Sequence, residues 1–451
     1  MPRPDNIEVE GNMTYIEFFD KEPMENICSC MARRPDRVIF VGQNKSRMQK
    51  CLPRYRRIFA DRGFPIRFET VAVKKDCLED IVEKLTGIME ENLGADESFV
   101  FDLTGGDDMC LVAMGILFEK FRGCGLQMHR FNLRNNRITD CDADGNVLEE
   151  TEAPAISIEE NLRVSGGDII YESQQRQGTV EWELNEEFLR DVDYLWAALA
   201  NVGRYASFSA WNRQCDIFAA IEAYGTVEGL TSSVSADALD EALLYDGKDP
   251  HRTVDRMIRK LISYQLIAYT EENGRITVTY KNPQIKRCLT KAGQTLETVV
   301  YAYALQARDR MGAPVYNDVM TGVYIDWDGD PATEQDKVDT TNEIDVLMMH
   351  GFVPVFVSCK NGSIKEREID ELYKLETVAN RFGGKYAKKV LVATMLKSST
   401  RAAYFRQRAR DMGITLLEPA DLDKDAFVQA VGAVWNSVAP NPCPATAGKS
   451  T

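Results

Sequence analysis

Short apolar segments alternate with segments of helical periodicity from residue 13 to about residue 175. Apolar runs at 37–42 and 98–103 have the length and composition of buried strands, and helical patterns follow at 45–62 and from residue 109. Strands that alternate with helices form a parallel, doubly wound sheet. We therefore predict an α/β, Rossmann-like domain over residues 1–178.

Glycine and polar residues follow the predicted strands, which is where ligands bind on a doubly wound sheet. Thr104, Gly105 and Gly106 form a turn that opens a helix, so main-chain amides and the helix N-terminus suit a phosphate. The candidate ligand contacts are Asp20, Lys21, Gly42, Gln43, Asn44, Lys45, Thr104, Gly105, Gly106, Asp107 and Met109.

The pattern changes in residues 179–285, which we predict to be a separate unit. Helical stretches at 188–200, 210–224 and 250–264 precede two short strands around Asn273-Gly274, a strong hairpin signal. Three helices and a hairpin are the outline of a winged helix. Such a fold either binds DNA or serves as a dimerising linker, and the linker role is the one we expect.

Two apolar segments at 342–347 and 353–360 are predicted to form a second hairpin. Glu343 and Asp345 are two residues apart, so both are expected on one face of the first strand. The second strand ends in Lys360. Carboxylates bind a divalent cation, and a lysine orients the attacking water or offsets transition-state charge. The pattern therefore predicts a metal-dependent phosphodiesterase.

The third unit, residues 286–437, resembles the PD-(D/E)XK nuclease fold. The similarity lies in the order helix, three strands, helix and strand, and in Glu297, Asp345 and Ser358-Cys359-Lys360. The resemblance implies that Glu297, Asp345 and the main-chain carbonyl of Cys359 bind Mn²⁺ or Mg²⁺. It also implies that Lys360 orients the nucleophile.

Ser358 stands where that family usually carries an acid. A serine hydroxyl supplies no carboxylate charge to a metal ion. Either Ser358 binds the ion through water, or another acid compensates, and Glu343 and Glu376 are the candidates. A third interpretation is a nuclease domain that has lost its activity.

The first unit resembles the CARF (CRISPR-associated Rossmann fold) domain, in the strand that ends at Gly42 and in Asp102-Leu103-Thr104-Gly105-Gly106. Taken with the other two units, the whole chain resembles the ancillary nucleases of type III CRISPR systems. This implies a homodimer with one pocket for a cyclic oligoadenylate, foremost cyclic tetra-adenylate. Asp107 and Asp108 would repel a phosphate and leave the ring size open. The implied activity is ligand-activated cutting of RNA and/or DNA with little sequence preference.

Basic residues without any acid fill the segment 385–410, although the formal net charge of the chain is −16. That net charge argues against a general nucleic-acid-coating surface, so substrate contacts are expected only near the nuclease site. Four residues of the segment are expected to hold the substrate backbone: Lys388, Lys389, Arg401 and Arg408.

Three other functions fit the same residues. A CARF-like sensor with a winged helix and an inactive nuclease domain would bind DNA on signal and cut nothing. A ring nuclease would degrade the cyclic ligand in the first unit, without a metal. A restriction or repair endonuclease would cut without any second messenger.

The sequence contains no apolar run of about 18 residues and no apolar segment near its start, so we predict neither a membrane helix nor a signal peptide. The 11 cysteines are scattered and suit reduced thiols. The expected location is the cytoplasm. Residues 438–451 are rich in Pro, Ala, Ser and Thr and are predicted to be a disordered tail.

Overall fold

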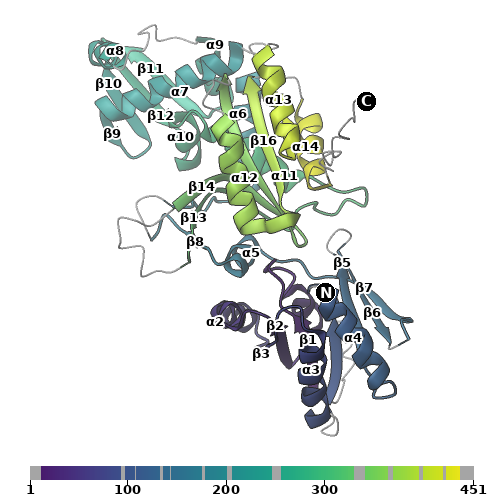
Figure 1. Cartoon of the computed structure of the whole chain (residues 1–451). Helices are drawn as coiled ribbons and strands as arrows, with labels where there is room; N and C mark the ends of the chain where they lie inside the picture. Colours follow the sequence, from purple (N-terminus) through teal and green to yellow (C-terminus); the bar gives the residue numbers. More distant parts are fainter. Residues whose placement is uncertain are drawn as a thin grey trace, which may run out of the picture.

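The computed structural model describes residues 12–92, 97–106, 108–132, 136–142, 144–174, 178–200, 206–245, 255–329, 341–363, 369–395, 400–419 and 423–436. These residues form sheets of seven, four and six strands. Each predicted unit contains one of these sheets, except that the third sheet takes one strand, β8, from the range predicted for the first unit (Figure 1). The predicted tail lies outside the described residues.

The first sheet has the strand order β3-β2-β1-β4-β5-β6-β7. Pairing is parallel up to β5, and β6 and β7 extend the sheet antiparallel. The strand order reverses between β1 and β4, the position at which doubly wound sheets bind ligands. The predicted Rossmann-like unit is therefore confirmed. Its elements are β1 (Asn12–Phe18), α1 (Cys28–Arg33), β2 (Arg37–Gly42), α2 (Lys45–Asp61), β3 (Arg67–Ala72), α3 (Leu78–Asn92), β4 (Glu97–Asp102), α4 (Asp108–Lys120), β5 (Gln127–Asn132), β6 (Arg137–Asp142) and β7 (Val147–Glu152).

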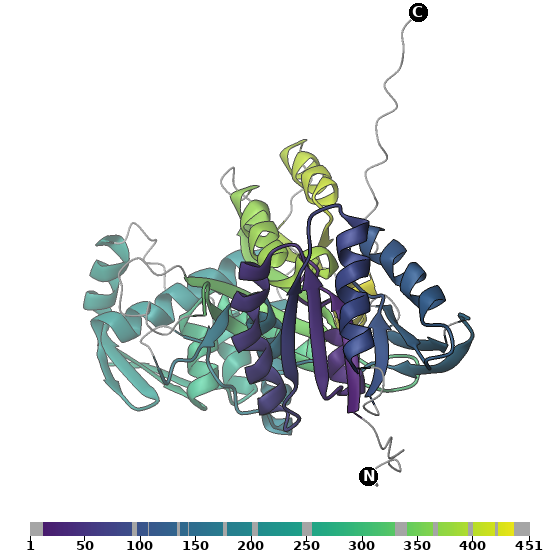
Figure 2. The ribbon, with the colours of Figure 1, turned by 60° about the horizontal axis from the view of Figure 1, so that its bottom comes forward.

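Helices cover both faces of this sheet (Figure 2). Ile16 and Phe18 of β1 pack in one core with α3 and α4, whereas Tyr15 packs in another with α1 and α2. This alternation follows from the two-residue period of a strand. Turns occupy residues 23–27, directly before α1.

The middle unit combines helices with an antiparallel sheet of order β11-β12-β10-β9. Asn273 and Gly274 both have positive φ, at 52° and 71°, as a two-residue hairpin turn requires. The predicted hairpin is confirmed, and the winged-helix assignment stays a prediction. The elements are α6 (Glu186–Ala200), α7 (Ala206–Tyr224), β9 (Thr226–Glu228), β10 (Thr231–Ser235), α8 (Ala236–Tyr245), α9 (Asp255–Ser263), β11 (Ile267–Glu272), β12 (Arg275–Tyr280) and α10 (Pro283–Thr290).

The third sheet has the order β17-β16-β15-β14-β13-β8. The predicted hairpin of β14 and β15 is present, with Gly351 at a φ of 59° in its turn. Strand β8 falls within the range expected for the first unit, but it pairs with β13 and so belongs to this sheet. The elements are α5 (Ile158–Ser165), β8 (Asp168–Ile170), α11 (Gln294–Gln306), β13 (Asp318–Asp326), β14 (Thr341–His350), β15 (Val353–Ser363), α12 (Ile369–Gly383), η3 (Gly384–Tyr386), β16 (Lys388–Met395), α13 (Thr400–Asp411), β17 (Ile414–Leu417), α14 (Lys424–Ala433) and η5 (Val434–Asn436).

The first and third units share a hydrophobic core. One continuous cluster contains Phe40 and Tyr55 of the first unit together with Phe352 and Phe382 of the third. The Lys385 ammonium of the third unit also forms an ion pair with Glu25 of the first unit at 2.7 Å. A buried shared core couples the positions of the two units.

Candidate active site

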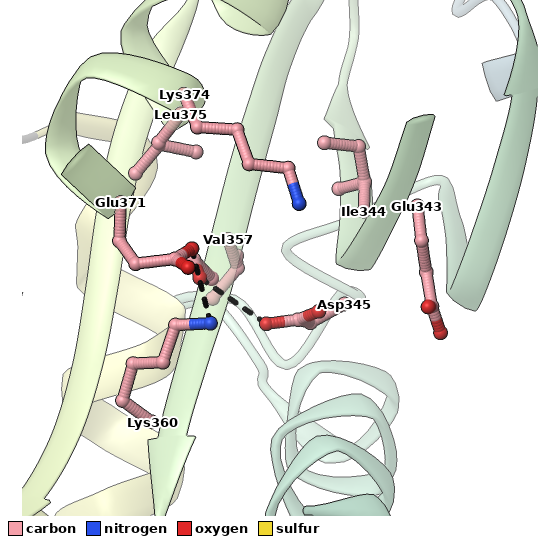
Figure 3. A pocket seen from close by; sticks show the side chains of 9 residues that line it. Glu343, Ile344, Asp345, Val357, Lys360, Glu371, Lys374 and Leu375 are labelled. Atoms are coloured by element: carbon pink, nitrogen blue, oxygen red, sulfur yellow. Dashed lines mark hydrogen bonds and ion pairs between the residues drawn. The ribbon is translucent and has the colours of Figure 1, made fainter. Parts of the chain in front are cut away.

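A pocket lies where β14, β15 and α12 meet (Figure 3). The ladder between β14 and β15 ends at the pair Val346–Val357, so the two strands separate just where the predicted acid and lysine begin. The separation leaves room for side chains between the strands. The pocket is lined by Glu343, Ile344, Asp345, Val357, Ser358, Lys360, Glu371, Lys374 and Leu375.

Asp345 is held by two donors from the neighbouring strand. Its Oδ2 accepts hydrogen bonds from the Cys359 amide at 2.5 Å and the Ser358 hydroxyl at 3.2 Å. Burial raises the pKa of Asp345, and the Cys359 amide and the Lys360 ammonium lower it by less. Ser358 therefore fixes the aspartate, which is a role that a carboxylate in its place could not fill.

Glu297 lies on the first turn of α11 and is almost completely buried. Its Oε2 accepts a hydrogen bond from the side chain of Gln294 at 3.1 Å. Burial first, and then the charge of Asp345, raise the pKa of Glu297 to about 8, whereas Lys291 opposes this effect. Glu297 is thus buried and Asp345 half-buried, and the two carboxyl groups repel each other when both are ionised.

A divalent cation fits this pair of acids. Among the described residues, no three His, Cys, Asp or Glu side chains gather as a ready-made metal site. A cation between Glu297 and Asp345 would nevertheless remove the repulsion that raises the pKa of Glu297. Main-chain oxygens and water complete the shell of such ions in proteins.

Lys360 projects from β15 toward Asp345, and Lys374 enters the same pocket from α12 (Figure 3). The Lys360 ammonium forms an ion pair with Glu371 at 3.1 Å. Burial lowers the pKa of Lys360, but Asp345 and Glu371 raise it by more, so the lysine is a cation. Sequence reasoning missed Glu371 and Lys374, although a spacing of three on one helix puts them on the same face.

The two acids proposed to compensate for Ser358 point elsewhere. Glu376 forms an ion pair with Lys389 at 3.2 Å and does not line the pocket, because its position on α12 is turned away from that of Glu371. The compensating role of Glu376 stays a prediction. Glu343 lines the pocket but diverges from Asp345 (Figure 3), and it accepts a hydrogen bond from the Tyr324 hydroxyl at 2.9 Å.

In the first unit, the turn after β4 packs directly on the end of β1. The Gly106 amide donates to Asp20 Oδ2 at 3.2 Å. Gly106 has a φ of 102°, and a Cβ there would lie 2.7 Å from Cβ of Phe18. Only glycine fits this position without displacement of β1. The structure thus brings Asp20, Gly105 and Gly106 together at the switch point.

Several other predicted ligand contacts have structural partners. The Thr104 hydroxyl accepts from the Phe131 amide at 2.9 Å, and Asn44 caps α2 by accepting from the Arg47 amide at 3.0 Å. Gly42 lies against Met48. Exposed positions at the same edge are held by Lys21, Gln43, Lys45 and Met109. Asp107 lies outside the described residues.

Comparisons with known proteins agree with this geometry. Residues 284–426 match the family described as "Card1-like, endonuclease domain". The third unit is thus similar to the endonuclease domain of Card1-like proteins. The match contains every residue of the predicted nuclease site and confirms the predicted resemblance for this unit.

Two solved structures share the fold over nearly the whole chain. One is protein VC1899 from Vibrio cholerae, with 18% identity, a TM-score of 0.69, and coverage of 94% of this chain and 98% of that one. The other is Can2 from Sulfobacillus thermosulfidooxidans in complex with cyclic tetra-adenylate, with 15% identity, a TM-score of 0.62, and coverage of 93% and 99%. No curated protein matches the sequence.

In the third unit, Lys388 and Lys389 lie far from the pocket. They pair with Val355 and Phe356, four to five residues before Lys360 on β15 and thus roughly 15 Å away along the strand. Lys389 is half-buried, with an ion pair to Glu376 and donation to the Met412 carbonyl at 2.7 Å. Substrate contact by Lys388 and Lys389 stays a prediction.

The two arginines predicted to bind substrate lie on α13. The Arg408 guanidinium is centred 5.3 Å from the Tyr373 ring, next to α12, and its substrate contact stays a prediction. The side chain of Arg401 lies outside the described part of the structure.

In the described part of the chain, no helix is both long and apolar enough to span a bilayer.

Proposed function

We propose that the protein is a metal-dependent endonuclease of type III CRISPR defence that a cyclic oligoadenylate activates. One observation carries the nuclease part. Two mutually repelling carboxyl groups, of buried Glu297 and half-buried Asp345, lie beside the cationic Lys360 in a unit that matches an endonuclease family.

Glu297, Asp345 and the main-chain oxygen of Cys359 would hold Mn²⁺ or Mg²⁺. When bound, such an ion lowers the pKa of water and offsets charge on the phosphate. The chain's own residues prepare this site: Ser358 and the Cys359 amide fix Asp345, and Glu371 holds the Lys360 ammonium in the pocket. Lys360 then orients the attacking water or a phosphate oxygen.

Lys374 is a second candidate contact for the phosphate. It enters the pocket from the opposite wall to Lys360 (Figure 3). The contacts proposed here go to the phosphate, which carries no base information, so we expect RNA and/or DNA to be cut with little sequence preference.

Two features support a cyclic tetra-adenylate site in a homodimer. Can2, which shares the fold, is described in complex with this ligand. Helix α4, which starts at the glycine turn, exposes Met109, Leu111, Val112 and Ile116 by 40%, 45%, 50% and 42%. An exposed apolar face next to the turn suits an interface with a second copy, and a two-fold ligand suits a two-fold interface.

A chain of direct contacts supports coupling between ligand and nuclease. The segment 20–25 begins at Asp20, which accepts a hydrogen bond from the Gly106 amide of the glycine turn. At its other end, Glu25 Oε1 forms an ion pair with the Lys385 ammonium at 2.7 Å. The Tyr386 hydroxyl donates to the same oxygen. η3 connects α12, which carries Glu371 and Lys374, to β16. A ligand that shifts Asp20 would therefore act on a segment that is continuous with the pocket.

The test is a cleavage assay with Mn²⁺ or Mg²⁺ on labelled single-stranded RNA, single-stranded DNA and supercoiled plasmid. Each substrate is incubated with cyclic tetra-adenylate, with cyclic hexa-adenylate or with neither. We expect cutting that requires one cyclic ligand and is lost in Lys360→Ala. Ligand binding without any cutting would favour a DNA-binding regulator instead, and loss of the ligand in EDTA would indicate a ring nuclease.

A further inference from the structure

Asn361, directly after Lys360, connects three elements of the molecule. Its side-chain nitrogen donates to Asn212 Oδ1 at 2.7 Å and to the Ala292 main-chain oxygen at 3.4 Å. Its Oδ1 accepts from the Thr394 hydroxyl at 3.0 Å. Thr394 lies on β16, and Ala292 lies just before α11, the helix that carries Glu297.

Asn212 belongs to α7 of the middle unit, yet it pairs with Asn361 in both directions. Its side-chain nitrogen donates to the Asn361 main-chain oxygen at 2.5 Å, while its own oxygen accepts from the Asn361 amide. Both side chains are half-buried. Two hydrogen bonds between the same two residues fix their relative orientation as well as their distance.

Strand β15 needs side-chain hydrogen bonds near Lys360, because its main-chain ladders are incomplete there. The ladder between β15 and β16 is irregular between Lys360 and Ser363, and the ladder to β14 has already ended at Val357. The main chain of Lys360 therefore has fewer ladder partners than the first half of β15. The Thr394 hydroxyl supplies one, through the Lys360 carbonyl at 3.3 Å.

We propose that Asn212 and Asn361 form a positioning pair that sets Lys360 and Glu297 relative to each other. The pair joins the strand end that carries Lys360 to the start of α11 and anchors both to α7. Neither asparagine touches the reacting atoms. The middle unit then supplies a part of the nuclease site, and its role extends beyond linking the other two units. This inference rests on the proposed function, because it assigns a role to residues around that site.

The kinetic test compares Asn212→Ala, Asn361→Ala and the double variant with Ser209→Ala, an exposed position on the same helix. We expect each single variant to lower kcat for cleavage by about 10- to 100-fold with KM changed by less than about two-fold, since misplacement of a catalytic group acts on the chemical step. The kcat of the double variant should be no lower than that of the slower single variant. Multiplied effects of the two changes, or rates equal to that of Ser209→Ala, would overturn the proposal.

A second readout does not depend on cleavage. Amide hydrogen exchange of the peptide 355–363 should accelerate in Asn212→Ala and not in Ser209→Ala, with the protein otherwise folded. Exchange that is unchanged in both variants would overturn the proposal. If exchange accelerates in Asn212→Ala but the wild-type protein cuts no substrate, the proposed function is rejected and the positioning pair is retained.

Discussion

Glu297 and Asp345 are acids in surroundings that favour their neutral forms. Burial and the charge of Asp345 raise the pKa of Glu297 to about 8, against an ordinary value of 4.5. A metal ion must displace that proton before it can bind. The residues that the sequence predicted as metal ligands are therefore the ones whose titration should report on metal binding.

The first prediction concerns pH and metal affinity. The dissociation constant for Mn²⁺ should increase about ten-fold for each pH unit below 8, because one proton competes for Glu297. Calorimetry in buffers of different ionisation enthalpy should detect about one proton released per ion at pH 7. Affinity that is flat between pH 6 and pH 8 would contradict the assignment.

The second prediction concerns stability without metal. Glu297 binds a proton in the folded state between pH 4.5 and about 8 that it has lost in the unfolded state, so stability should fall as pH rises through this range. Glu297→Gln removes this dependence, and we expect it to stabilise the metal-free protein at pH 8 by roughly 1–3 kcal/mol. Denaturant titration at pH 5.5 and pH 8 measures the pH dependence of stability and the effect of Glu297→Gln. Glu119→Gln, at an exposed position, is the control.

At the scale of elements, the sequence predicted the long periodic segments and missed short or phase-dependent features. The bounds of β2 agree with the predicted range 37–42, and those of α2 agree with 45–62 to within one residue. β8 has three residues and no pattern of its own, because its partner β13 is distant in sequence. The choice between Glu371 and Glu376 depends on which face of α12 meets β15. The packing of Leu372, Leu375 and Phe382 sets that face. This packing cannot be predicted from the sequence alone.

The third prediction concerns η3 as the connection between ligand turn and nuclease. Tyr386→Phe removes the hydroxyl that donates to Glu25 and leaves the ring in place. We expect ligand affinity to stay within about two-fold while the ratio of cleavage rates with and without ligand falls several-fold. Tyr404→Phe, which alters an exposed tyrosine, is the control. An unchanged activation ratio would exclude this route.

At the scale of the whole molecule, the sequence predicted the Rossmann-like sheet early in the chain and the nuclease-like unit that follows it. The contact of α7 with the end of β15 was not, because it joins residues 149 positions apart that carry no common motif. The core that the first and third units share could not be predicted either, because the apolar pattern of each unit suggests a separate core.

The fourth prediction concerns assembly. Val112→Glu places a charge on the exposed apolar face of α4 and should convert a dimer into a monomer in sedimentation velocity. We expect ligand affinity to fall at least ten-fold in parallel, because each copy would supply half of the pocket in the proposed dimer. Ala60→Glu adds the same charge at an exposed position on α2 and should change neither property.

The most direct test of a signal-gated nuclease is the ratio of initial cleavage rates with and without cyclic tetra-adenylate, measured with Mn²⁺ on one substrate for the wild type and Lys360→Ala. We predict a ratio well above ten for the wild type. Lys360→Ala should bind the ligand equally well and cut at least 100-fold more slowly. Equal wild-type rates with and without any cyclic ligand, or undiminished cutting by Lys360→Ala, would contradict this account.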